Sequence, residues 1–375
     1  MTSEKYNSAP QAGDTEHKTR ANIFYIAPLP LITGVAATDS QQLHRAVNEV
    51  YLDFAIGAAN IEFSVRCYIG IIAGIAFLIF MLCLGLGVID HINSGRPVLE
   101  IVVTAFSPNW PIWGFFSFLI SSYSLFLLQA IYQISSTPPT RFNRQRREVA
   151  YVAKRGQPPR LIPWEEIIAC VSSSTVATQY GTQQKFALMI GFVDTSDGQV
   201  MWLTLPASTL GMAVSEWEAI RSYMEEGPSA LRKPMMGTDM EEGTMAFFHM
   251  CRRGYLLDHG YLRYVFSFLL IQFFSGWTLP CHIASWVKRL PKTAFPKAVQ
   301  DWSKPLPPEQ WQAPSAELIA QSEEVRKSLR KGMTIFEHFS AQQQRSIRPA
   351  KSPTQPRKAQ TWCALKFRWT PVLAF

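Results

Sequence analysis

The chain has 375 residues, of which 47% are hydrophobic and 17% charged, and its formal net charge is +8 at pH 7. Its six cysteines are scattered without a CxxC pair, which suits a reducing cytosol and argues against a disulfide framework. The basic excess fits retention at the cytoplasmic face of an anionic membrane at least as well as nucleic-acid binding.

The first 65 residues are predicted to precede the membrane part of the chain. Residues 1–40 are expected to form a disordered leader, and no apolar stretch near the start indicates a cleavable signal peptide. Within residues 41–65, Leu43, Val47 and Phe54 recur at helical spacing and predict an amphipathic helix. This helix would either lie on the inner leaflet or pack on a cytoplasmic domain.

Residues 66–134 predict a transmembrane hairpin. Two runs, 67–89 and 110–134, contain no charged residue and are each long enough to cross a bilayer as one helix. Seven lysines or arginines against one acidic residue follow between Arg141 and Arg160, so both chain ends are expected on the cytoplasmic side. The absence of charge within the spans argues against a transporter or channel.

Residues 141–235 predict a small cytoplasmic β domain closed by a helix. Four runs rich in β-branched and aromatic residues, 147–154, 167–174, 185–194 and 200–207, are typical of strands. In the helix that follows, Ser215 and Glu218 form a capping-box pattern, and Gly227-Pro228 is a stop signal. Antiparallel strands plugged by one helix resemble pleckstrin-homology-like domains, so the expected class is an α+β membrane protein.

Tryptophans mark the predicted core of this β domain. Trp164 follows a proline at the start of a strand, Trp202 lies within a strand, and Trp217 lies on the apolar face of the helix. Together with Gly227 and Pro228, Trp164 and Trp217 are interpreted as structural residues of the domain.

Residues 236–340 predict a helical region with a membrane-associated segment at 264–287. Gly276 and Pro280 interrupt this segment, and basic residues flank it on both sides. We therefore expect a membrane-surface element, a re-entrant element or a helix docked on the hairpin, in preference to a third crossing. Residues 291–314 predict a linker or wrapping segment, residues 315–339 a helix, and residues 341–375 a basic disordered tail.

No motif for catalysis or for a bound group is recognisable. The adjacent carboxylates of Glu165-Glu166 and of Glu225-Glu226 diverge on a strand or helix. The histidines lack metal-ligand spacing, and GxSxG, Walker A and GxGxxG patterns are absent. The chain is therefore predicted to be no enzyme and to need no metal or cofactor.

The basic cluster after the hairpin has two interpretations. Arg141, Arg144, Arg146 and Arg147 would either anchor the second span on lipid phosphates or form a headgroup or partner site at the edge of the β domain. No aromatic residues interleave these arginines, so a nucleic-acid partner is not expected. The same cluster is a candidate partner for Glu225 and Glu226, whose alternative is to face water.

Several stretches in this order carry a family resemblance. The hairpin is followed by PPTRFNRQRREVAYV, IPWEEI and SEWEAIRSYMEEGPSAL, with Ser222 where a basic residue is expected. Over residues 65–310 this resembles a bacterial membrane protein family of unknown function found in type VI secretion and polymorphic-toxin loci. No catalytic residue is carried over from it.

The resemblance implies a setting for the chain. It predicts a protein of the bacterial inner membrane that acts by binding a toxin, an effector or a secretion component, as an immunity protein or an effector adaptor. The alternative is a membrane-anchored lipid- or ligand-sensing module.

Overall fold

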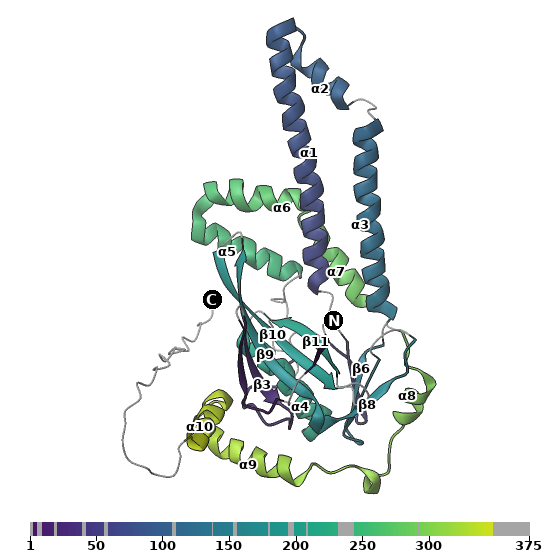
Figure 1. Cartoon of the computed structure of the whole chain (residues 1–375), viewed down its shortest axis with the longest axis vertical. Coiled ribbons are helices and arrows are strands. Elements are labelled where there is room, and N and C mark those ends of the chain that lie inside the picture. The colour runs from purple at the N-terminus through teal and green to yellow at the C-terminus, as the bar shows by residue number, and fades with distance from the viewer. Residues whose placement is uncertain are drawn as a thin grey trace, which may run out of the picture.

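The computed structural model describes residues 3–5, 10–18, 21–39, 43–55, 59–106, 110–136, 138–152, 156–178, 181–193, 199–207, 209–231, 244–290 and 293–347. Two antiparallel sheets form a compact body, and two long helices project from it (Figure 1). Of the basic disordered tail predicted for 341–375, residues 341–347 belong to helix α10, Ile335–Ile347, so the prediction is wrong there, and the rest lies outside the described residues.

The larger sheet has six strands in the order β1-β11-β10-β9-β3-β2. Their bounds are β1 Ser3–Lys5, β2 Thr15–Lys18, β3 Ala21–Ala27, β9 Ile168–Thr178, β10 Gly181–Val193 and β11 Gln199–Ala207. The smaller sheet has the order β4-β5-β6-β7-β8, with β4 His44–Val47, β5 Tyr51–Phe54, β6 Thr140–Asn143, β7 Glu148–Tyr151 and β8 Arg160–Pro163.

Alternating side chains place the core between the two sheets. In β10, Leu188, Ile190 and Phe192 point into the main core, whereas Met189 and Val193 pack with a second cluster on the opposite face. This is the two-residue period of a strand that is covered on both faces. The four predicted strands of the β domain are confirmed as β7, β9, β10 and β11.

Helix α4, Leu210–Glu226, closes the main core and is buried on all sides from Ala213 to Met224. Its predicted end is confirmed, since Gly227 caps it with φ 97°. The predicted start at Ser215 is wrong. The Thr209 side chain accepts a hydrogen bond from the Met212 amide and starts the helix earlier, so Ser215 lies within it.

The N-terminal residues are part of the fold, and the predicted disordered leader is wrong for the described residues. Strand β3 pairs with β9, and Tyr25, Ile26 and Leu31 are buried. Residues 31–39 then run along α4, where the Ser215 hydroxyl donates to the Ala36 carbonyl. The N-terminal residues thus supply three strands of the larger sheet, with β3 an inner strand between β9 and β2, and with β1 and β2 at its two edges.

The amphipathic helix predicted for 41–65 is also wrong over most of its length. The structure has the hairpin β4–β5 there, with the Asn48 side chain accepting from the Val50 and Tyr51 amides in its turn. Leu52 and Phe54 are buried. The i, i+4 spacing misled because pairing with β6, far along the chain, decided the structure.

Two helices emerge between neighbouring strands of the smaller sheet. Helix α1, Ala59–Ser94, leaves after β5, and α3, Trp110–Ser136, returns before β6; Phe54 is directly opposite Thr140 in that strand pair. Both helices are long and apolar enough to cross a membrane. The connection between them contains a further apolar helix, α2, Val98–Phe106.

The segment predicted as membrane-associated is a broken helix docked on the base of the hairpin. Helix α5, Met245–Arg263, is broken at Gly260, whose φ of 75° and ψ of 169° are not helical, and the chain then continues through a π-helical turn, Tyr264–Leu269, into α6, Leu270–Phe274. Helix α7, Leu279–Arg289, follows a bend of 45° and packs through Val287 on Ile61 and Val65 of α1. By length and composition, residues 245–274 and 279–289 would form a third candidate span only if these two bent helical segments are counted as a single span.

The last part of the described chain wraps around both sheets. Helix α8, Lys297–Trp302, lies beside β6 and β7, and α9, Ala316–Arg330, and α10, Ile335–Ile347, cover the N-terminal segment. Hydrogen bonds from the Leu306 and Gln312 amides to Gln145 hold the proline-rich stretch against the β6–β7 turn. The predicted wrapping segment follows this path.

Candidate functional site

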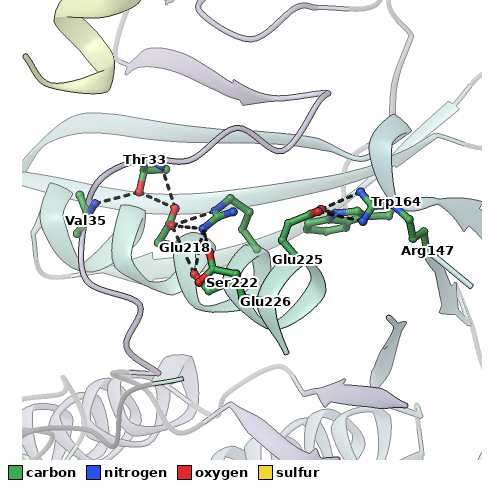
Figure 2. Close-up of polar contacts among 9 residues, drawn as sticks. Thr33, Val35, Arg147, Trp164, Glu218, Ser222, Glu225 and Glu226 are labelled. Atoms are coloured by element: carbon green, nitrogen blue, oxygen red, sulfur yellow. Dashed lines mark hydrogen bonds and ion pairs between the residues drawn. The ribbon is translucent and has the colours of Figure 1, made fainter. Parts of the chain in front are cut away.

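Two groups of hydrogen-bonded charged side chains lie along α4, one of them reaching the turn between β6 and β7. We call them the Arg147 cluster (Arg147, Trp164, Glu165 and Glu225) and the Glu218 cluster (Thr33, Glu218, Arg221, Ser222 and Glu226). Figure 2 shows that Glu218, Ser222, Glu225 and Glu226 come from the same helix, with Thr33 next to Glu218 and with Arg147 and Trp164 next to Glu225.

The Arg147 cluster joins three segments that are distant in sequence. The Arg147 guanidinium makes two hydrogen bonds to Glu225, at 2.9 and 2.8 Å, and one to Glu165 at 3.0 Å. The Trp164 indole N–H donates to the same Glu225 carboxylate at 2.9 Å. Such a two-point arginine–carboxylate contact fixes orientation as well as charge.

The local backbone conformation brings the side chains of the Arg147 cluster together. Arg147 ends the β6–β7 turn with φ 49°, and Trp164 and Glu165 lie in the short 3₁₀ helix Trp164–Glu166 that follows β8. The Trp164 and Trp217 rings stack at a centroid distance of 5.4 Å. Glu165 also accepts the Ser315 amide, so the cluster ties the start of α9 to the β domain.

The Glu218 cluster ties α4 to the N-terminal segment. One oxygen of Glu218 accepts the Thr33 amide at 3.0 Å and the Thr33 hydroxyl at 2.7 Å. The other accepts two hydrogen bonds from Arg221, at 2.9 and 2.7 Å, and Arg221 reaches Glu226 at 3.0 Å. Although burial opposes the charged form, Glu218 and Glu226 raise the pKa of Arg221 above its ordinary value.

The other arginines of the predicted basic cluster also have partners within the chain. Arg141 is buried, bonds Asp53 at 2.6 and 2.7 Å, and lies between the rings of Tyr51 and Phe295. The Arg146 side chain donates to the Trp302 carbonyl. The half-buried Arg144 lies beside Gly227, over the Trp311 ring.

These contacts show whether Glu225 and Glu226 face water or pair with arginines. Glu225 is paired with Arg147 and does not simply face water, whereas the Glu226 side chain is 50% exposed and contacts Arg221. Arg141 and Arg147 are buried on carboxylates of their own chain. A lipid or partner contact by the four arginines stays a prediction, and Arg144 and Arg146 are the more accessible of them.

The residues predicted to be structural lie in or beside the β domain core. As predicted, Trp164, Trp202 and Trp217 are all buried, Trp164 and Trp217 in the main core and Trp202 in the second cluster on the opposite face of the larger sheet. Gly227 is buried against the Arg144 guanidinium, and Pro228 starts the short 3₁₀ helix Pro228–Ala230.

Sequence reasoning recognised Glu225 as a candidate partner of the basic cluster but missed Asp53, the Glu218–Arg221 pair and Thr33. Asp53 lies in an apolar strand, Tyr51–Phe54, where a lone carboxylate already signals a buried ion pair. Arg221 and Glu218 are three residues apart on a helix, a spacing at which side chains meet. Thr33 carries no comparable signal, because its contact joins segments 185 residues apart.

A third group, Asp39, His44 and Glu216, places one potential ligand atom each within 4.8 Å of the others. His44 Nδ1 lies 3.7 Å from Asp39, and Nε2 lies 3.7 Å from Glu216. The two carboxylates thus face different ring nitrogens of His44. Burial lowers the pKa of His44, against the opposing effect of Asp39.

Comparison with known proteins gives one match. A model described as a family of unknown function (DUF6708) matches residues 117–314, from within α3 to the end of the proline-rich stretch. The chain belongs to this family. No curated protein and no solved structure matches it. The DUF6708 region contains the whole Arg147 cluster, whereas Thr33 of the Glu218 cluster lies outside it.

Membership in the DUF6708 family brings no activity with it, so the chemistry has to be judged from the side chains. Glu165, Glu218 and Glu225 each accept hydrogen bonds from an arginine and from a further donor of the chain. Arranged in this way, the carboxylates hold segments together. The two clusters are therefore best described as the framework that fixes α4 within the domain.

Proposed function

We propose that this chain is a membrane-anchored binding protein whose hairpin fixes a β domain at the bilayer surface. The observation that carries the proposal is the exposure of α1 and α3. Both helices have an apolar window of 18 residues with none buried inside the molecule. Apolar surface of that extent needs a non-aqueous surrounding.

The orientation proposed is that of a bacterial inner-membrane protein with both termini in the cytoplasm. The basic excess between Arg141 and Arg160 and the weakly charged connection near Ser94 support it. In a cysteine-free background, a Ser94→Cys reporter should react with an impermeant thiol reagent added to spheroplasts. A reporter at Thr204, exposed on β11, should react only after lysis. The reverse result would contradict this orientation.

Strand order supports a pleckstrin-homology-like classification of the β domain. Four consecutive strands, β5 to β8, form a meander in one sheet, three more, β9 to β11, form a meander in the other, and α4 follows. The hairpin is then an insertion between the first two strands. Strands β1 to β4 and helices α9 and α10 would be additions to that plan.

For the activity itself, we propose a non-enzymatic role in a type VI secretion or toxin locus, as an immunity protein or effector adaptor. Two features support binding over catalysis. The carboxylates of the charged clusters are engaged by arginines, and the domain is held close to the membrane in which a membrane-targeting toxin would act. The partner would be a toxin, an effector or a secretion component.

The test is protection of a sensitive host that expresses the neighbouring toxin gene. The full chain should protect, as should His249→Ala and His282→Ala, because no catalytic group is needed. Deleting residues 68–134 should abolish protection, whereas replacing them with an unrelated two-span hairpin should preserve it. Protein level and membrane content are measured for every variant.

Other outcomes would redirect the proposal. Loss of protection by His249→Ala at unchanged protein level would favour enzymatic detoxification. Protection by the deletion variant would place binding in the cytosol, with the hairpin only a tether. If no neighbouring gene is toxic, the pleckstrin-homology-like strand order favours the second candidate, a lipid- or ligand-sensing module.

A further inference from the structure

The hairpin of α5 and α6 carries a large apolar surface that the fold leaves uncovered. It runs across α1, roughly at right angles to it, between the sheets and the far end of the spans (Figure 1). Its exposed side chains include Leu257 at 84%, Leu262 at 74%, Phe266 at 72% and Phe273 at 65%. Phe266, Leu270 and Phe273 share one helical face by their spacing.

This exposure is not due to missing packing within the hairpin. Its inner face is a closed aromatic cluster in which Phe248 and Phe268 are buried, and Tyr255 and Trp277 pack against them. Arg252 donates to the Tyr264 hydroxyl across the two helices. Because the inner face is already packed, no described part of the chain covers the outer apolar face.

The depth of α6 follows from its contacts with α1. Ser275 lies beside Gly70, where an added Cβ would be 3.2 Å from its Oγ, and the Phe274 ring lies 6.2 Å from the Phe77 ring. The uncharged run of α1 starts at Cys67. At 1.5 Å per residue, α6 therefore lies about 5 to 15 Å beyond the start of that run.

Hydrogen bonds from Arg66 fix the position of the α5–α6 hairpin along α1. Arg66, the last charged residue before the run, bonds Glu62, the Gln272 side chain and the Trp277 carbonyl. Helix α7 then returns toward the sheets, where Arg45 donates to the Lys288 carbonyl. Basic residues thus lie at the end of α7 near the β domain, and the aromatic face of α6 lies on the membrane side.

We infer that α6 and the π-helical turn before it are inserted halfway into the cytoplasmic leaflet, with their Phe266–Phe273 face in contact with lipid acyl chains. The inference rests on the proposed membrane crossing by α1 and α3. The apolar surface of α6 is continuous with that of α1, and a depth of about 5 to 15 Å falls within one half of a hydrocarbon core about 30 Å thick. The hairpin is a re-entrant wedge and does not cross.

The experiment places an environment-sensitive fluorophore on single cysteines of the full chain in a cysteine-free background. The protein is reconstituted in phosphatidylcholine–phosphatidylglycerol vesicles that contain lipids with a nitroxide at acyl carbon 5 or carbon 12. Three exposed sites are compared: Phe273→Cys on α6, Leu78→Cys near the centre of the α1 run, and Thr204→Cys on β11.

We expect quenching at Phe273 to be at least twofold stronger with the carbon-5 nitroxide than with the carbon-12 nitroxide, and the opposite order at Leu78. Thr204 should not be quenched. Quenching at Leu78 with none at Phe273 would overturn the inference and leave the crossing intact. Lack of quenching at both sites would overturn the membrane anchor as well. If a Leu257→Cys label were quenched by iodide added on the side of the membrane opposite to that of Thr204, the segment would cross the bilayer completely and the inferred wedge would be wrong.

Discussion

Helices α4 and α1 invert the usual relation between polarity and burial. Helix α4 carries Glu216, Glu218 and Arg221, yet it is enclosed on every side, whereas α1 carries no charge from Cys67 to Ile89 and is largely uncovered. Each is nonetheless consistent with its surroundings. The charges of α4 have partners inside the protein, and the proposed surrounding of α1 is lipid.

The difference teaches what each helix contributes. Buried ion pairs add little net stability, since desolvation offsets their attraction, but they penalise any arrangement that separates the partners. The Glu218 cluster thereby selects one path for residues 31–39 along α4. Helix α1 makes few contacts with the rest of the chain over its apolar window, and its proposed contribution is to place the protein in the membrane.

The largest effect should come from removing a buried ring beside α4. Trp217→Ala removes a fully buried side chain that stacks on Trp164, and we expect a loss of about 3–5 kcal/mol in the free energy of unfolding. Denaturant unfolding of the full chain in detergent measures it. Trp110→Ala, on an 82% exposed side chain of α3, is the matched control and should leave the midpoint unchanged.

A charge left without its partner should come next. Arg147→Met strands Glu225 and Glu165, and because these carboxylates retain some solvent exposure we expect about 3 kcal/mol. The same unfolding assay applies, with Arg326→Met, an exposed arginine of α9, as control. The double variant Arg147→Met/Glu225→Gln should recover part of the loss. If Arg147→Met alone were as stable as the native protein, the cluster would have no structural role.

A charge placed on α1 tests the other half of the comparison. Leu82 is 63% exposed, so Leu82→Lys should leave the β domain folded but disfavour insertion by about 3 kcal/mol, since lysine in a span is costly. Carbonate extraction of membranes reports the inserted fraction, and Leu82→Phe should behave as the native protein. Full insertion of the lysine variant would argue that α1 faces water or protein.

The smallest effect concerns His44. Burial lowers its pKa in the folded protein, so the unfolded chain takes up a proton first as the pH falls below about 6.5. Stability should therefore be full above that pH and decline from there toward the lower folded pKa. His44→Gln should show a shallower decline in the thermal midpoint between pH 7 and 5.5, with Asp39 and Glu216 unchanged; parallel curves would exclude His44 as a contributor.

Local signals were enough to predict one half of the β domain. Strands β9 to β11, the Gly227 cap and the three buried tryptophans follow from short-range period, turn chemistry and side-chain size. The hairpin β4–β5 was mistaken for a helix because its apolar spacing suits both, and its pairing partner β6 follows only after the helices α1 and α3. For the same reason the partners Asp53 and Thr33 were missed, while Arg147 and Glu225 were at least recognised as candidates.

The insertion of the spans between β5 and β6 fixes an order of events during synthesis. Strand β5 leaves the ribosome before α1, and β6 only after α3, so the smaller sheet cannot close until both membrane helices have been made. Closing so long a connection is slow unless its ends are brought together. The proposed insertion of both helices into the bilayer would do so, since two crossings return the chain to the side of the membrane on which β5 lies. On this proposal, closure of the smaller sheet is timed by the machinery that inserts α1 and α3.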